Sequence, residues 1–140
     1  MAKCNTSRTL IAQIAIPVPL QGLFDYLLPE SADPQNIQTG MRVLVPFGKG
    51  TKTGVILNIT HLGDSRIDPQ KLKRVEQIID SVPLLSAKDL QLLKWASRYY
   101  HHPLGEVLST AFPAALRQGK PAILPHDYCY NLTEQGRQTL

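Results

Sequence analysis

Short β-branched runs alternate with turn-forming residues over the first half of the chain. Residues 9–18 are rich in Ile and Val and end at Pro17 and Pro19, which predicts a strand running out into an extended segment. Phe24–Leu28 is a second short strand candidate, bounded by glycine and proline. Residues 29–40 contain several turn formers and no apolar period, so they predict a loop.

Two further strands are predicted after this loop, joined by a glycine-rich turn. Apolar residues recur at every second position from Met41 to Phe47, which is the period of a half-buried strand. Residues 48–54 predict a turn into the β-branched run 55–59, so these two strands should form a hairpin. A fifth strand is expected around 72–79. Five short strands with such connections favour a small curled sheet or barrel, as in oligonucleotide-binding folds.

The pattern changes to helices after Pro83. Ser86 followed by Asp89 resembles a capping box, with Asp in place of the usual Glu or Gln. Apolar residues then recur on one helical face until the chain approaches Pro103, where the helix should stop. A second, shorter helix is predicted over 104–112.

These elements predict an α+β fold in one domain with an appendage. The domain should span 1–115, with the sheet at about 9–80 and the helical segment at about 86–115. Glycine and proline residues over 116–126 indicate a linker, and 127–140 should be the incomplete start of another unit.

Composition excludes several protein classes. With 140 residues, 43% hydrophobic and 19% charged, the chain has the composition of a globular protein. It contains no apolar run of the ~18–20 residues that a membrane span needs, and we expect neither membrane insertion nor secretion. Cys4 and Cys129 are far apart in the sequence and form no CxxC pair, which excludes a disulfide framework or zinc ribbon within this chain and fits a reducing compartment.

Positive charge is concentrated in one part of the sequence. Residues 41–75 hold seven Lys or Arg and two Asp, a local charge of +5, whereas the whole chain carries +4. Clustered basic residues beside turns are a typical footprint for phosphates, although a solvated basic face would show the same pattern. The candidates for phosphate contact are Arg42, Lys49, Lys52, Lys71 and Arg74.

No catalytic or metal-binding motif is found in the sequence. The glycines of segment 48–54 match neither the phosphate-binding P-loop nor the dinucleotide fingerprint. The four histidines lack the spacing of a closed zinc site, and no nucleophile or acid–base pair stands in a recognised arrangement. We therefore predict no catalytic residue, no metal ligand and no cofactor in this chain.

The most suggestive tripeptide is Phe24-Asp25-Tyr26, where two aromatic residues flank a carboxylate. Aromatic faces stack on bases of any sequence, and a carboxylate can accept a hydrogen bond from a hydroxyl. The alternative is a strand whose aromatic residues are simply part of the core.

Several motifs occur together in the order and spacing of a known family. They are IPVPL at 16–20, FDYLLP at 24–29, GMRV at 40–43, VPFGK at 45–49 and WASRYYHHPLGEVL at 95–108. Over residues 9–120 the chain resembles the N-terminal part of primosomal protein N′, the PriA family of replication-restart helicases.

The resemblance implies a 3′ DNA-binding domain followed by the start of a winged-helix domain at 127–140. In that family the domain captures the 3′ end of the nascent leading strand at stalled forks, without sequence preference. The matching site residues are Phe24, Asp25, Tyr26, Gly48 and Lys73, with Lys71 or Arg74 as alternatives to Lys73.

Each implied role has a chemical basis. Asp25 would accept a hydrogen bond from the free 3′-hydroxyl, which only a strand end presents. Phe24 and Tyr26 would shape the pocket and stack on or wall the terminal base. Gly48 would let the backbone approach the sugar, and Lys73 would pair with a phosphate.

The resemblance also implies what the chain should lack and what it should bind. Full-length members are ATP-dependent 3′–5′ DNA helicases, and their ATP-binding loop, helicase motifs and cysteine-rich zinc region are missing here. We expect no enzymatic activity from this chain, and we expect ATP and zinc to act only in the rest of the parent protein. The expected partners are DNA with a free 3′ end, single-strand-binding protein and other primosome proteins, at forks in the bacterial cytoplasm. The alternative is a primosome interaction module that binds an acidic partner, such as the tail of single-strand-binding protein.

Overall fold

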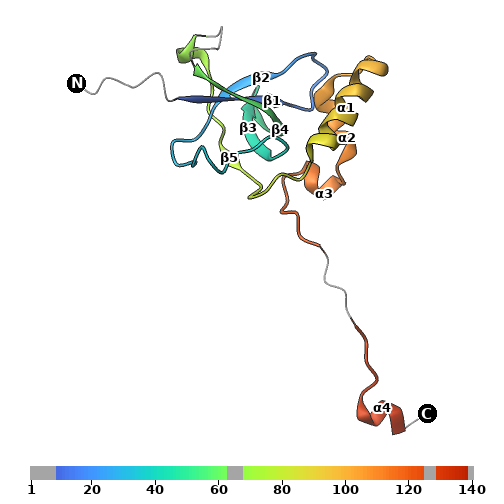
Figure 1. Cartoon of the computed structure of the whole chain (residues 1–140). Coiled ribbons are helices and arrows are strands. Elements are labelled where there is room, and N and C mark those ends of the chain that lie inside the picture. The colour runs from blue at the N-terminus through green and yellow to red at the C-terminus, as the bar shows by residue number, and fades with distance from the viewer. Residues whose placement is uncertain (1–8, 63–67, 125–128, 139–140) are drawn as a thin grey trace.

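A five-stranded antiparallel sheet followed by helices forms the fold (Figure 1). The computed structural model describes residues 9–62, 68–124 and 129–138. The strands are β1 (Leu10–Ala15), β2 (Phe24–Leu27), β3 (Arg42–Phe47), β4 (Gly50–His61) and β5 (Gln77–Ile78). The helices are α1 (Ala87–Tyr99), α2 (Leu104–Ala111), α3 (Ala114–Arg117) and α4 (Glu134–Gln138), with a 3-10 turn η3 (Pro69–Lys71). The predicted α+β class with an OB-like sheet is confirmed.

The sheet has the strand order β2-β1-β4-β3-β5, and β3 and β4 form the predicted hairpin. The turn of this hairpin is shorter than predicted. Phe47 pairs with Gly50, so only Gly48 and Lys49 form the turn, and residues 50–54 belong to β4. Gly48 has a φ of +61°, which suits the first position of a type II′ hairpin turn, where glycine is preferred.

The segment before and including β5 contacts both edges of the sheet. β5 pairs with β3, whereas the Leu27 N–H of β2 donates to the Lys73 carbonyl at 2.9 Å and the Val75 N–H donates to the Leu27 carbonyl at 2.9 Å. The predicted fifth strand at 72–79 is therefore a regular strand over only two residues, because its first half pairs with β2. The sheet curls without closing into a barrel, and β2 is brought close to the end of β3.

One face of the curled sheet forms the main core. The period of two puts Ala12 and Ile14 of β1 on this face, both fully buried, together with Tyr26 of β2 and Val43 of β3. The other buried members are Ile16, Val18, Leu28, Ile37, Met41, Val45, Ile56 and Val75. For β3, the alternation predicted from Met41 to Phe47 identifies the core-facing side of the strand.

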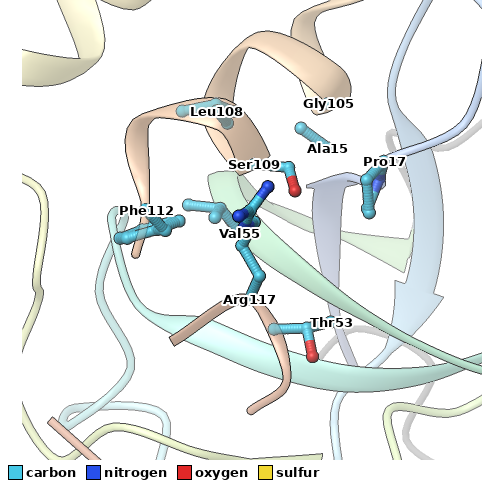
Figure 2. A pocket seen from close by; sticks show the side chains of 9 residues that line it. All are labelled: Ala15, Pro17, Thr53, Val55, Gly105, Leu108, Ser109, Phe112 and Arg117. Atoms are coloured by element: carbon cyan, nitrogen blue, oxygen red, sulfur yellow. The ribbon is translucent and has the colours of Figure 1, made fainter. Parts of the chain in front are cut away.

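The helices α1, α2 and α3 are grouped beside the sheet and form a second core with its other face (Figure 1). Figure 2 shows α2, with Leu108 and Ser109, lying over Ala15 and Val55 of the sheet. A Cβ atom at Gly105 would lie 1.8 Å from the Ile16 carbonyl oxygen, so only glycine allows this close approach.

The capping box predicted at the start of α1 is confirmed. The Ser86 hydroxyl accepts from the Asp89 N–H at 3.2 Å, and the Asp89 carboxylate accepts from the Ser86 N–H at 2.8 Å. The Ser86 hydroxyl also donates to that carboxylate at 2.6 Å. These bonds lower the pKa of Asp89 below its usual 3.8.

The folded unit extends beyond the predicted boundary at residue 115. Leu116 packs against the second core, and Arg42 donates to the carbonyls of Leu116 at 2.7 Å and Lys120 at 3.0 Å. A linker beginning at residue 116 is therefore placed too early. The expected winged-helix start at 127–140 contains α4 and stays a prediction, since its residues 127–128 and 139–140 lie outside the described residues. Along the described ranges, no helix combines the length and apolar character needed to cross a membrane.

Candidate nucleic-acid interface

Residues from three separate segments meet at one surface pocket of about 240 Å³. The first segment is β2, the second is the end of β3 with its turn, and the third is the last residue of η3 with the residues that follow it. The lining residues are Phe24, Asp25, Tyr26, Pro46, Phe47, Gly48, Lys71 and Lys73. All five site residues expected from the family resemblance line this pocket, as does Lys71, one of the two alternatives to Lys73.

Aromatic contacts hold β2 against the end of β3. The Tyr26 hydroxyl donates to the Pro46 carbonyl at 2.9 Å. The Phe24 and Phe47 rings meet edge to face, with centroids 5.3 Å apart and an interplanar angle of 81°. Because Gly48 directly follows Phe47, these contacts fix the turn beside the tripeptide.

Tyr26 belongs to the core as well as to the pocket wall. Its side chain is only 5% exposed, and burial raises the pKa of its phenol above the usual 10.0. With so little of its side chain exposed, Tyr26 has little ring surface for stacking on a terminal base, so we expect it to wall the pocket instead. Tyr26 shapes the pocket by anchoring β2 to β3, and Phe24 remains half-buried.

Asp25 lies on the opposite face of β2 from its two aromatic neighbours, as the period of two requires. It is half-buried, and its Oδ1 accepts a hydrogen bond from Gln13 Nε2 at 3.2 Å. A carboxylate has about four lone-pair sites, so it can accept more than one hydrogen bond at once. Asp25 thus places a negative, hydrogen-bond-accepting group at the pocket.

Two exposed lysines supply positive charge at the same pocket as the tripeptide. Lys71 ends η3 and Lys73 follows two residues later, and both line the pocket. The backbone of Lys73 is fixed, because its carbonyl accepts from the Leu27 N–H of β2. The pocket therefore offers lysines that can bind a phosphate and a carboxylate that can bind a hydroxyl.

The sequence of this chain is similar to those of known DNA-binding proteins. The model of the 3′ DNA-binding domain (3′BD) of PriA matches residues 13–113. This chain belongs to the PriA 3′ DNA-binding domain family. It is therefore a DNA-binding domain of the kind found in replication restart proteins.

Relatives of the PriA domain come from diverse bacteria. Replication restart protein PriA of Haemophilus influenzae is 36% identical over 93% of this chain and 17% of its own length. The PriA proteins of Buchnera aphidicola, from the pea-aphid strain, and of Bacillus subtilis are 26% and 29% identical over 92% and 76% of this chain. The chain spans 17% of the first two relatives and 13% of the third.

Two of the basic residues expected to contact phosphate in this PriA domain are placed elsewhere by the structure. Arg42 is fully buried and its guanidinium group donates two hydrogen bonds to Asp80, at 2.6 and 2.9 Å, so it cannot reach a phosphate. Arg74 donates to the Leu28 carbonyl and to the Glu30 carboxylate, outside the pocket. The buried partner Asp80 offsets the desolvation of the Arg42 guanidinium group.

Lys49 and Lys52 are exposed but do not line the pocket of the PriA domain. Lys49 is in the hairpin turn next to Gly48, and Lys52 lies on β4 opposite Val45. They remain candidates for contact with phosphates further along a bound strand. No cluster of three or more His, Cys, Asp or Glu side chains suited to a metal ion occurs among the described residues.

Sequence reasoning missed Gln13 of β1. Its side chain contacts Asp25, and it pairs across the sheet with both Asp25 and Asn58. The available signal was a single polar residue inside the apolar run of residues 10–16. That signal could not name Asp25 as the contact, because strand pairing was unknown.

Proposed function

We propose that this PriA domain captures the 3′ end of a DNA strand in the pocket described above, without reading base sequence. The observation that supports the proposal is the meeting of Asp25, Gly48 and Lys73 from three separate segments. In a replication-restart protein, such a pocket would hold the end of the nascent leading strand at a stalled fork.

The pocket chemistry matches a strand end. The Asp25 carboxylate would accept a hydrogen bond from the terminal hydroxyl, and Lys71 or Lys73 would bind the last phosphate. A Cβ atom built at Gly48 would meet nothing within 4 Å, so the space beside the turn is open to a ligand. These contacts involve hydroxyl, sugar and phosphate, which every DNA sequence shares.

Fluorescence anisotropy with labelled oligonucleotides tests the proposal. The three probes share one sequence and end in a 3′-hydroxyl, a 3′-hydrogen or a 3′-phosphate. We expect the hydroxyl end to bind ~10-fold more tightly than the hydrogen end, because a hydrogen bond to a charged group contributes ~1.5–3 kcal/mol. Equal affinities for the hydroxyl and hydrogen ends would overturn the proposal.

We further propose that DNA capture by this chain uses no metal or cofactor and takes place in the bacterial cytoplasm, where replication forks lie. ATP- and zinc-dependent steps would belong to the rest of the parent protein. Binding to the 3′-hydroxyl probe should be unchanged by EDTA and by ATP. A loss of affinity in EDTA would show that capture depends on a bound metal ion.

A second candidate function rests on an exposed aromatic cluster on α1. Trp95, Tyr99 and Tyr100 are 56%, 64% and 70% exposed. Trp95 and Tyr99 stack with centroids 5.1 Å apart, and Tyr100 meets Tyr99 edge to face at 4.9 Å. Arg98 lies in the last turn of the same helix. An acidic peptide with apolar side chains, such as the tail of single-strand-binding protein, would fit this surface.

Competition between peptide and oligonucleotide separates the two candidate functions. A tail peptide should bind through the aromatic cluster, so Trp95→Ala should weaken the peptide and leave the 3′-hydroxyl probe unaffected. If the peptide displaces the oligonucleotide and Trp95→Ala weakens both, DNA binds at the helix and the pocket is not its site.

A further inference from the structure

A directed chain of side-chain hydrogen bonds crosses three strands and ends on Asp25. On β4, the Ile59 N–H donates to Asn58 Oδ1 at 3.0 Å. Asn58 Nδ2 donates to Gln13 Oε1 of β1 at 3.1 Å, and Gln13 Nε2 donates to Asp25 Oδ1 of β2 at 3.2 Å. The first bond lies within β4, and the next two connect β4 to β1 and β1 to β2.

The direction of this chain is set at its backbone end. A backbone N–H can only donate, so it selects the oxygen of the Asn58 amide and turns the Asn58 nitrogen toward Gln13. Gln13 must then present its oxygen to Asn58, which leaves its NH₂ group for the carboxylate. A reversed Gln13 amide would face Asp25 with an oxygen, which a carboxylate cannot bind.

Sheet register builds this alignment. Gln13 is the direct cross-strand partner of Asp25 on one side and of Asn58 on the other. The register with β4 shifts immediately afterwards, since Ile14 pairs with Ile56. Such an irregularity re-aims side chains, and here it coincides with the row that ends at the pocket.

We propose that Gln13 is a positioning residue for recognition of the 3′-hydroxyl, an inference that rests on the proposed function of the pocket. Gln13 does not line the pocket, so it acts on DNA only through Asp25. Its amide holds the carboxylate in one orientation, and Asn58 keeps that amide from reversing. Discrimination between hydroxyl and hydrogen ends then depends on two residues that do not contact the ligand.

Substitutions at two positions test the inference with the hydroxyl and hydrogen probes. Gln13→Met keeps the length of the side chain and removes the donor, and we expect the preference for the hydroxyl end to fall by about 3- to 10-fold. Asn58→Asp should have a similar effect, because an aspartate there cannot donate to Gln13 and would favour the reversed amide. Affinity for the hydrogen end should stay within about 2-fold for Gln13→Met.

The matched control is Gln77→Met, at an exposed glutamine on β5 of the same sheet. It should leave the preference unchanged. Thermal melting checks that each variant is folded, and Asn58→Asp, at an exposed position, keeps the test valid if Gln13→Met fails to fold.

The outcomes separate the two proposals. If the unmodified chain does not distinguish the two ends, the pocket function fails, and the role of Gln13 fails with it. If the unmodified chain prefers the hydroxyl end and both folded variants keep that preference in full, the pocket function stands and the positioning role is wrong.

Discussion

The pocket is lined by one acidic and two basic side chains, and these opposite charges determine which groups of a DNA strand it can bind. The Asp25 carboxylate repels the phosphates of any strand that enters, whereas Lys71 and Lys73 attract them. Among the sugar and phosphate groups of a DNA strand, a terminal hydroxyl is a hydrogen-bond donor, and it makes the carboxylate an attractive partner. Single substitutions should therefore separate recognition of the end from general affinity.

Asp25→Asn keeps the shape of the side chain and removes its charge. We expect ~10-fold weaker binding of the 3′-hydroxyl probe, because a charge-assisted hydrogen bond becomes a neutral one. Binding of the 3′-hydrogen probe should be unchanged or slightly tighter, since a repulsive charge is gone. Anisotropy titrations measure both, and equal losses on the two probes would rule out a contact with the hydroxyl.

Lys73→Gln should weaken binding of all probes alike. Each phosphate neutralised by a lysine releases condensed counterions, with a slope of about −0.7 per phosphate for single strands in a plot of log K against log salt. The variant should make the slope less negative by about 0.7, the contribution of one phosphate contact. Lys88→Gln, an exposed position on α1, is the matched control and should leave the slope unchanged. An unchanged slope for Lys73→Gln would remove Lys73 from the phosphate path.

At the scale of elements, α1 and the hairpin are held by local interactions. The capping box of Ser86 and Asp89 begins α1, and Gly48 allows the tight turn between β3 and β4. Such features depend on residues close together in the sequence. They can be tested without DNA.

The Asp89 cap should make stability depend on pH. Hydrogen bonds from Ser86 lower the pKa of Asp89 in the folded chain, so the unfolded chain binds a proton more readily. The resulting stabilisation is present above the unfolded pKa near 3.8 and is lost as pH falls through the lower folded pKa. Asp89→Asn should melt at a lower temperature than the unmodified chain at pH 7, with the difference shrinking toward pH 3. A difference of equal size at both pH values would contradict this.

At the scale of the whole molecule, one buried ion pair joins segments that are distant in the sequence. Arg42 on β3 binds Asp80 after β5 and the carbonyls of Leu116 and Lys120 after α2. The buried side-chain nitrogen and oxygen atoms of the described residues all have partners. The pair thus connects the sheet, the segment after β5 and the end of the helical region.

Breaking this pair should destabilise the fold as a whole. Arg42→Met leaves the Asp80 carboxylate buried without its charged partner, which costs about 3–5 kcal/mol in the free energy of unfolding. Urea denaturation measures the loss. The double variant Arg42→Met with Asp80→Leu should recover part of it, because no unpaired charge remains. A loss below about 1 kcal/mol for the single variant would mean that the pair contributes little.

Some features of this PriA domain follow from the sequence alone because they depend on local patterns. The alternation in β3, the cap at Ser86 and the glycine turn each depend on neighbouring residues. The tripeptide at 24–26 was identified as a site because it matches a family motif, and the structure places it in a pocket with Gly48 and Lys73.

Only the tertiary structure decided the contacts between distant segments. Burial of Arg42 depends on Asp80, 38 residues away, and no local pattern could pair them. The core position of Tyr26 depends on the Pro46 carbonyl, and the contact of Gln13 with Asp25 depends on strand register. Long-range pairing thus determined which charges reach the surface, whereas local propensity determined where strands and helices form.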